Sequence, residues 1–247
     1  MSGVRIAVLD MDGTLLPGTL GADLLRRAAV TGVGDAQAIA RALATIRRYA
    51  DGEMDLENAV KTVYRLYAQA MAGVPCDAAL LLARHVWNEA SRTVFPFTAP
   101  LITLLHEKGF RTVLISGSPH EIIQLAATDL GIDTALGTQR ATRNGRPTGA
   151  LRYAPALADG KRAALLALTA GWELDLRGSL AIGNSPSDAQ IFEMVGTAIA
   201  FEPRDGLCST AAARGWPIAD RTDLLDLCTE RIHGDSGAPR RLKPPSA

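Results

Sequence analysis

The sequence predicts an α/β protein, in which a doubly wound, mostly parallel sheet forms a Rossmann-like core and four helices form a separate cap domain. Three observations predict this fold. Short apolar runs that end in turn residues recur along the chain, helical segments alternate with them, and the stretch from Leu20 to Arg92 is helical throughout. Such runs are typical of strands buried on both faces of a parallel sheet. Alternation of strands with helices is typical of a doubly wound sheet.

The core is expected to comprise residues 1–17 and 95–232. Its first strand is Arg5–Leu9, an apolar run that ends at a cluster of acidic and turn residues. The Asn144-Gly145 pair lies between two short extended segments and predicts a two-residue hairpin turn. Further strands are expected at residues 112–116, 179–183 and 197–201, and helices at residues 99–108, 119–130 and 161–170.

The helical stretch is expected to form a cap domain over residues 18–94. Turn signals at residues 31–35, 51–52 and 73–75 divide it into four helices. The segments around Pro17-Gly18 and Phe95-Pro96 are the expected hinges. In the third helix, apolar residues recur every three or four positions, as one buried helix face requires: Leu56, Ala59, Val60, Val63, Leu66, Tyr67 and Ala70.

Composition and charge exclude several classes of protein. Of the 247 residues, 47% are hydrophobic and 21% are charged, and the 26 basic side chains equal the 26 acidic ones. A protein that binds nucleic acid depends on an excess of basic side chains, which this chain lacks. No apolar run reaches the ~18 residues of a membrane helix, and Asp10 comes too early for a signal peptide. We therefore expect a soluble, cytoplasmic monomer or homodimer that binds a small molecule, and neither nucleic acid nor membrane.

The cysteines and the C-terminal tail carry no signal for a functional site. Cys76, Cys208 and Cys228 lie far apart, without the spacing of a zinc site or a disulfide framework. Residues 233–247 are rich in proline and poor in apolar side chains, so this tail is expected to be disordered.

The strongest signal for chemistry is Asp10-Met11-Asp12-Gly13-Thr14, directly after the first strand. Two carboxylates at positions i and i+2 face the same side at the carboxyl end of a strand, where open α/β sheets hold their ligands. Such a pair can bind Mg²⁺, while one carboxylate attacks phosphorus and the other transfers a proton. A capped turn would explain an Asp and a Gly after a strand, but not the whole pattern.

Three later segments fit the same chemistry. Ser116 ends the second strand, and a hydroxyl followed by free backbone N–H groups at a helix N-terminus can cradle a phosphate. Lys161 opens a helix, where the helix dipole disfavours a cation, so a role such as neutralising a phosphate is expected. Asn184 and Asp188 follow a fourth strand and offer oxygen ligands to a metal. Taken singly, an ordinary strand-to-helix turn explains Ser116, and a surface position explains Lys161.

Taken together and in order, these motifs resemble the haloacid dehalogenase superfamily of phosphohydrolases. The segments Ser116–Pro119, Asn144–Gly149 and Gly183–Asp188, the last followed by Val195-Gly196, resemble its phosphoserine-phosphatase-like branch. The helical stretch matches the place of that branch's cap, and the resemblance covers about residues 4–220.

The resemblance implies a role for each motif residue. Asp10 would be the nucleophile and Asp12 the general acid and base, with the backbone carbonyl of Asp12 beside Asp10 on Mg²⁺. The implied catalytic residues are Asp10, Asp12, Ser116 and Lys161; the phosphate is bound by Asp10, Ser116, Gly117 and Lys161; and the metal by Asp10, Asp12, Asn184 and Asp188.

The chain departs from the family pattern at two places. Asn184 stands where the family usually has Asp, and an amide oxygen binds Mg²⁺ without a full charge. The glutamate that holds the amine of phosphoserine is missing after the first motif, where Asp23 is the nearest acid. Five cap residues are candidates for substrate contacts, although a solvated or core position is the more common explanation for each: Arg47, Arg48, Tyr49, Tyr64 and Tyr67.

We therefore predict a Mg²⁺-dependent phosphomonoester phosphatase that acts through an aspartyl-phosphate intermediate on a small, soluble phosphorylated metabolite. Two alternatives stay open. One is a phosphoserine phosphatase proper. The other is a binding or regulatory protein that kept the fold but lost turnover, which Asn184 suggests.

Overall fold

The computed structural model describes residues 3–234, and its centre is a seven-stranded sheet with the strand order β4-β3-β2-β1-β5-β6-β7. Neighbouring strands pair in parallel, except that β3 and β4 are antiparallel. The predicted mostly parallel, doubly wound sheet is confirmed. The strands are β1 (Ile6–Leu9), β2 (Arg111–Pro119), β3 (Thr134–Arg143), β4 (Arg146–Tyr153), β5 (Leu180–Gly183), β6 (Thr197–Phe201) and β7 (Ile218–Ala219).

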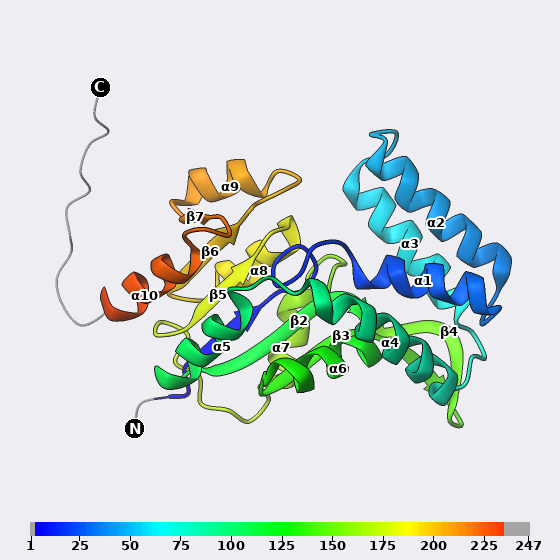
Figure 1. Cartoon of the computed structure of the whole chain (residues 1–247), viewed down its shortest axis with the longest axis horizontal. Coiled ribbons are helices and arrows are strands. Elements are labelled where there is room, and N and C mark those ends of the chain that lie inside the picture. The colour runs from blue at the N-terminus through cyan, green and yellow to red at the C-terminus, as the bar shows by residue number, and fades with distance from the viewer. Residues whose placement is uncertain (1–2, 235–247) are drawn as a thin grey trace.

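Helices cover both faces of this sheet (Figure 1). Alternate residues of β1 point to opposite faces: Ala7 and Leu9 join one apolar cluster, and Ile6 and Val8 join the other. The first cluster includes α5 (Thr98–Glu107), α6 (His120–Leu130) and α10 (Leu224–Gly234), and the second includes α7 (Gly160–Leu168), α8 (Ala189–Phe192) and α9 (Leu207–Arg214). Two short 3₁₀ turns span Ser91–Thr93 and Pro186–Asp188.

Four helices lie between β1 and α5 and form the cap: α1 (Leu20–Thr31), α2 (Ala36–Ala50), α3 (Leu56–Ala70) and α4 (Cys76–Ala90). Asp35 and Asp55 begin α2 and α3 as N-caps, and their carboxylates accept hydrogen bonds from the N–H groups of Ala38 and Asn58. The fourth helix runs along α6 of the core, where the indole of Trp87 donates a hydrogen bond to Asp129.

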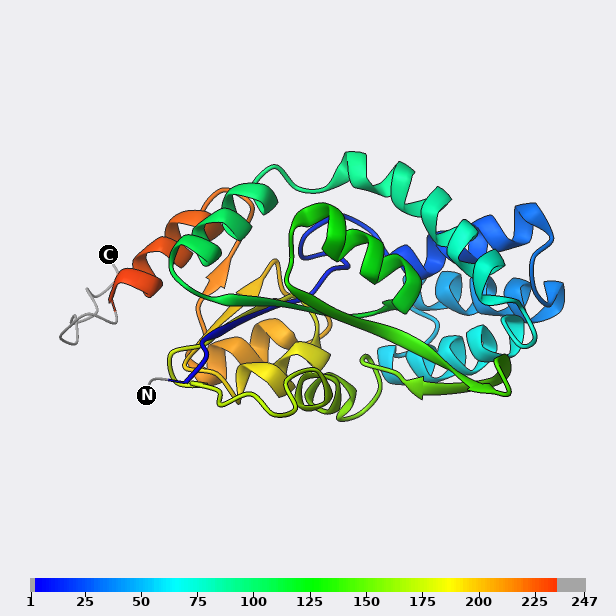
Figure 2. The same cartoon turned by 90° about the horizontal axis from the view of Figure 1, so that it is seen from below.

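The β3–β4 hairpin reaches from the core to the cap (Figure 2). Its turn residues, Asn144 and Gly145, both have positive φ, which is the geometry of the predicted two-residue hairpin. Beyond the core, the carbonyl of Pro147 accepts a hydrogen bond of 3.1 Å from the N–H of Gly73, between α3 and α4. The cap and the sheet are therefore joined by a backbone hydrogen bond, in addition to the two segments where the chain passes between them, before α1 and after α4.

The structure differs from the sequence predictions at several element ends, most clearly at those of β2 and α10. Strand β2 continues through Ser118 to Pro119, because Pro119 still pairs with Thr138 of β3 after a shift in register. Helix α10 runs to Gly234, two residues into the predicted tail, and residues 235–247 of that tail lie outside the described residues. Within residues 3–234, no helix combines the length and the apolar character needed to cross a bilayer.

Candidate active site

The candidate site lies at the carboxyl ends of β1, β2 and β5, where the predicted motif residues meet. Asp10 directly follows β1 and is 6% exposed. Its Oδ2 accepts a hydrogen bond of 2.9 Å from the Thr14 hydroxyl, and its Oδ1 accepts one of 2.6 Å from Nζ of Lys161. The carboxylate at the end of the central strand is thus fixed by two partners.

Lys161 bridges two buried carboxylates. Its side chain is 3% exposed, and its ammonium group contacts both Asp10 and Asp188. Burial lowers the pKa of Lys161, but the two carboxylates outweigh burial, so this pKa lies above its usual value. The lysine therefore stays charged in spite of its position at the start of α7.

Asp188 ties the turn after β5 to this lysine. Its Oδ2 accepts hydrogen bonds from the N–H of Asn184 at 3.1 Å and from the N–H and hydroxyl of Ser185 at 2.9 Å each. Its Oδ1 contacts Lys161. Both oxygens of the Asp188 carboxylate are therefore engaged within the protein.

Asp12 lies where the core meets the first cap helix. Its Oδ2 accepts hydrogen bonds from the hydroxyls of Ser118 at 2.6 Å and Ser116 at 3.1 Å. Its Oδ1 accepts one from the N–H of Leu20 at 2.8 Å, so it caps α1, whose own N-cap residue makes no side-chain bond. Burial raises the pKa of Asp12, although these hydrogen bonds lower it in part. A raised pKa suits a carboxyl group that must hold a proton.

The segment after Ser116 is held from the cap as well as from the core. The carbonyl of Gly117 accepts hydrogen bonds from the Tyr64 hydroxyl of α3, at 2.7 Å, and from the Thr138 hydroxyl of β3, at 2.6 Å. A side chain at position 117 would collide with the Tyr64 hydroxyl, so only glycine permits this approach. The N–H of Ser118 donates to the Ser116 hydroxyl at 3.0 Å.

The residues around Asn184 fit a magnesium ion. Asn184 is 2% exposed, and its amide forms no hydrogen bond within residues 3–234. This amide lies against Gly13, where any side chain would overlap it. Oxygen ligands are available from the Asp10 carboxylate, the Asp12 carbonyl and the Asn184 amide, and Mg²⁺ prefers such ligands. In the described part of the chain, no three His, Cys, Asp or Glu side chains gather as a metal site, so the fit depends on these mixed donors.

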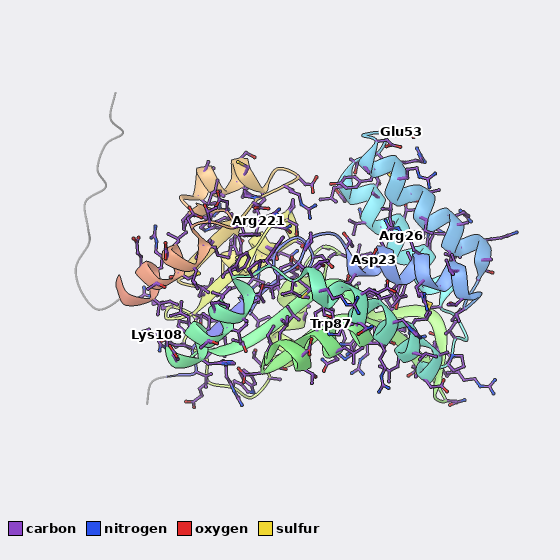
Figure 3. The ribbon with its side chains drawn as sticks, viewed as in Figure 1. Asp23, Arg26, Glu53, Trp87, Lys108 and Arg221 are labelled. Carbon is purple, nitrogen blue, oxygen red and sulfur yellow. The ribbon has the colours of Figure 1, made fainter. Side chains whose placement is uncertain are left out.

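The structure brings all the predicted motif residues to one place, but the cap candidates do not gather there. Asp23 forms an exposed ion pair with Arg26 on α1, at 2.5 Å (Figure 3). Arg47 is exposed, Arg48 pairs with Glu53, and Tyr67 packs in the apolar cluster. Of this group, Tyr64 reaches the site through Gly117.

Sequence reasoning gave no role to three side chains that touch the site or its loop: Thr14, Ser118 and Thr138. A signal for Ser118 was present, because it stands two residues after Ser116 and so faces the same side of an extended strand. Thr138 comes from a distant segment, and nothing in its sequence neighbourhood marks it. Tyr64 was among the cap candidates, but its partner Gly117 was not predicted.

Comparison with known proteins agrees with this geometry. Residues 7–193 match the family model described as haloacid dehalogenase-like hydrolase. Phosphoserine phosphatase SerB1 of Mycobacterium tuberculosis is 34% identical over 120 residues, which are 48% of this chain and 39% of that protein. Phosphoserine phosphatase of Lactococcus lactis is 28% identical over 201 residues, covering 81% of this chain and 85% of that protein.

Among solved structures, a protein of unknown function from Bordetella pertussis Tohama I superposes with a TM-score of 0.73 at 25% identity, covering 89% of this chain and 100% of that one. The first curated relatives are longer, and the matched segment spans about two fifths of their length. The family model nevertheless covers most of this chain, including all of the cap and the strands that carry the site. The chain belongs to the haloacid dehalogenase-like hydrolases, in their phosphoserine-phosphatase-like branch.

Proposed function

We propose that this chain is a Mg²⁺-dependent phosphatase that hydrolyses a small phosphomonoester in the cytoplasm. One observation carries the proposal: the buried Lys161 ammonium lies between Asp10 and Asp188, while Asp12 stands two residues from Asp10 with both of its oxygens held. This arrangement offers Asp10 as a nucleophile and Lys161 as a cation for the phosphoryl group. It also offers Asp12 as a carboxyl group whose pKa lies above its usual value.

The reaction proceeds in two displacements. In the first, a carboxylate oxygen of Asp10 forms a bond to phosphorus, the ester P–O bond breaks, and Asp12 gives its proton to the leaving oxygen. In the second, Asp12 takes a proton from water, the water oxygen bonds to phosphorus, and the bond between phosphorus and Asp10 breaks. Inorganic phosphate leaves, and both carboxyl groups return to their starting states.

The remaining residues position the phosphoryl group. Lys161 neutralises its negative charge, and the Ser116 hydroxyl with the backbone at Gly117 binds its oxygens. Tyr64 holds Gly117 from the cap side, so the phosphate loop and the cap are coupled. Exclusion of water by the cap strengthens each of these electrostatic contacts.

The metal would be held by the Asp10 carboxylate, the Asp12 carbonyl and the Asn184 amide. When bound, it supplies positive charge beside the phosphoryl oxygens. Each Asp10 oxygen has one partner, whereas Asp188 accepts three hydrogen bonds from the turn after β5 besides its contact with Lys161. We therefore assign Asp188 to positioning Lys161 and the turn, and not to the metal ligation that the sequence predicted.

The structure bears on both alternatives. A phosphoserine phosphatase proper needs an acid for the substrate amine, and Asp23, the candidate for that role, pairs instead with Arg26. A buried lysine held by two carboxylates is a costly arrangement, and its place beside Asp10 suits turnover better than loss of activity. The first point argues against phosphoserine as the substrate, and the second favours turnover.

The test is phosphate release from p-nitrophenyl phosphate, with and without Mg²⁺, by the native chain and by Asp10→Asn. We expect hydrolysis that needs both the metal and Asp10. The matched control is Asp23→Asn, which removes an exposed acid of α1 and should leave the rate unchanged. Full activity in Asp10→Asn would refute the assignment of the nucleophile.

A further inference from the structure

Arg204 reaches the candidate site from a loop that the motifs do not include. It lies between β6 and α9, and its N–H donates a hydrogen bond of 2.9 Å to the carbonyl of Asn184. Its guanidinium group folds back over the first motif, where Nη2 would lie 2.7 Å from a Cβ placed on Gly13. The Arg204 guanidinium and the Asn184 amide therefore both lie against Gly13 of the first motif.

The charge of Arg204 is not neutralised by a nearby acid. Within residues 3–234, no carboxylate forms an ion pair with it, and its side chain is exposed. The side chain that lies against the same glycine, at position 184, is an amide, which carries no charge to pair with the guanidinium. This chain thus keeps a free planar cation at the rim of the site, a group suited to binding a carboxylate or phosphate through two hydrogen bonds.

Arg204 also lies where the loop after β6 meets the cap. The next residue, Asp205, accepts a hydrogen bond from the hydroxyl of Tyr49, near the end of α2. A substrate whose phosphoryl group rests at the buried Asp10 must extend its remaining part toward solvent, past the first motif that the Arg204 guanidinium covers. The exposed guanidinium is therefore placed to meet the part of the substrate that is not transferred.

We propose that Arg204 binds a second anionic group of the substrate, so that this enzyme acts on phosphomonoesters that carry a carboxylate or another phosphate a few bonds from the ester. This inference rests on the proposed phosphatase function and adds a substrate class to it. The transferring phosphoryl group has its own partners in Lys161, Ser116 and Gly117, so Arg204 governs selectivity and not the chemical step.

The test uses pairs of esters that differ in the second group alone. 3-Phosphoglycerate and glycerol 3-phosphate differ by a carboxylate, as do phosphoserine and phosphoethanolamine, and fructose 1,6-bisphosphate and fructose 6-phosphate differ by a phosphate. kcat and KM are measured for the native chain, Arg204→Gln and Arg204→Lys. Arg214→Gln, which removes an exposed arginine at the far end of α9, is the matched control.

We expect the native chain to prefer one anionic member of a pair, and Arg204→Gln to lower kcat/KM for that ester about 10- to 100-fold, mainly through KM. The neutral member should change less than about 3-fold. Arg204→Lys should retain part of the native kcat/KM, because lysine keeps the positive charge but cannot donate two parallel hydrogen bonds to one anionic group. The pair that responds distinguishes a carboxylate from a second phosphate.

Other outcomes overturn the inference. Equal loss on both members of every pair would mean that Arg204 acts on the shared phosphoryl group, and no loss on any ester would mean that it binds no substrate. Calorimetric binding of the same pairs to Asp10→Asn gives a readout independent of turnover, and equal affinities for the members of each pair there would also reject the inference. If the native chain hydrolyses none of the esters and Asp10→Asn binds none, the proposed function fails and the inference fails with it.

Discussion

The hydroxyl of Tyr49 donates a hydrogen bond to the carboxylate of Asp205 and so joins the cap to the core beside the candidate site. Tyr49 lies near the end of α2, and Asp205 lies in the loop between β6 and α9, 156 positions later. Burial and Asp205 raise the pKa of this tyrosine to about 12, so the hydroxyl keeps its proton at physiological pH. The tyrosine can therefore donate this hydrogen bond whenever α2 lies against the loop between β6 and α9.

We expect Tyr49→Phe to weaken closure of the cap. Removing one exposed hydrogen bond should raise KM a few-fold, while the free energy of unfolding changes by less than about 0.5 kcal/mol, since exposed polar contacts contribute little to stability. Steady-state kinetics and urea unfolding check the two parts. Asp205→Asn should act similarly, and the double variant should add little to either single one, because both remove the same contact. Fully additive effects would show that the two residues act separately.

We expect Lys161→Met to destabilise the fold as well as to abolish activity. The substitution leaves Asp10 and Asp188 buried without their cation, and breaking such a buried pair costs about 3–5 kcal/mol. Urea unfolding at pH 7 measures the loss. The double variant Lys161→Met/Asp188→Asn should recover part of it, because one uncompensated charge is removed. A loss below about 1 kcal/mol in the single variant would contradict the buried ion pair.

We expect Asn184→Asp to tighten binding of Mg²⁺. A carboxylate adds a full charge where the amide offers a neutral oxygen, so the Mg²⁺ concentration for half-maximal activity should fall roughly tenfold, a change of about 1.4 kcal/mol in binding free energy. Calorimetric titration with Mg²⁺ gives the same quantity without turnover. Asp23→Asn serves as the control for nonspecific effects of acidic groups. An unchanged Mg²⁺ affinity would place the metal away from position 184.

Asp133 should make stability depend on pH. Burial raises its pKa, but hydrogen bonds from the N–H and hydroxyl of Thr112, at 2.8 and 2.9 Å, together with the nearby imidazole of His106, lower it more, so the net shift is downward. A lowered pKa contributes stability above the unfolded value of about 3.9, and this contribution is lost as the pH falls through the folded value.

Asp133→Asn should therefore lower the free energy of unfolding by about 1 kcal/mol at pH 7 and by less at pH 3, which lies below the unfolded pKa of about 3.9, so that part of the contribution is already lost there. Urea unfolding at both pH values measures this difference. Asp51→Asn is the control, because Asp51 is exposed and its carboxylate accepts no hydrogen bond within the described residues. Equal losses at the two pH values would refute a role for the charge of Asp133.

The sequence predicted the sheet and the motif residues because their signals are local. The apolar run of β1 ends at Asp10, and the spacing of Asp10 and Asp12 places both carboxylates at one strand end. The length of β2 was not predictable in the same way, since its last residues are extended by pairing between Pro119 and Thr138. That pairing depends on a neighbouring strand and leaves no mark in the sequence of β2 itself.

The contacts between cap and core were beyond sequence reasoning for a similar reason. Tyr64 and Gly117 lie 53 positions apart, and Tyr49 and Asp205 lie 156 positions apart. The interpretation of Tyr49 and Tyr64 as candidate substrate contacts identified useful residues but not their partners. Arg204 carried no signal, because its significance comes from the fold of its loop against Asn184 and Gly13.

The hairpin of β3 and β4 holds one side of the cap, and any movement of the cap should turn about this side. On that side, Pro147 bonds to the backbone of Gly73, and the buried Arg140 donates a hydrogen bond of 3.0 Å to the carbonyl of Val74. Near the end of α2, the hydroxyl of Tyr49 donates a hydrogen bond to Asp205 of the core. Any movement of the cap should therefore be larger at the turn between α2 and α3, marked by Glu53 in Figure 3, than at the α3–α4 turn. Loss of the bond between Tyr49 and Asp205 would then free α2 from the loop before α9 while the hairpin side stays bound.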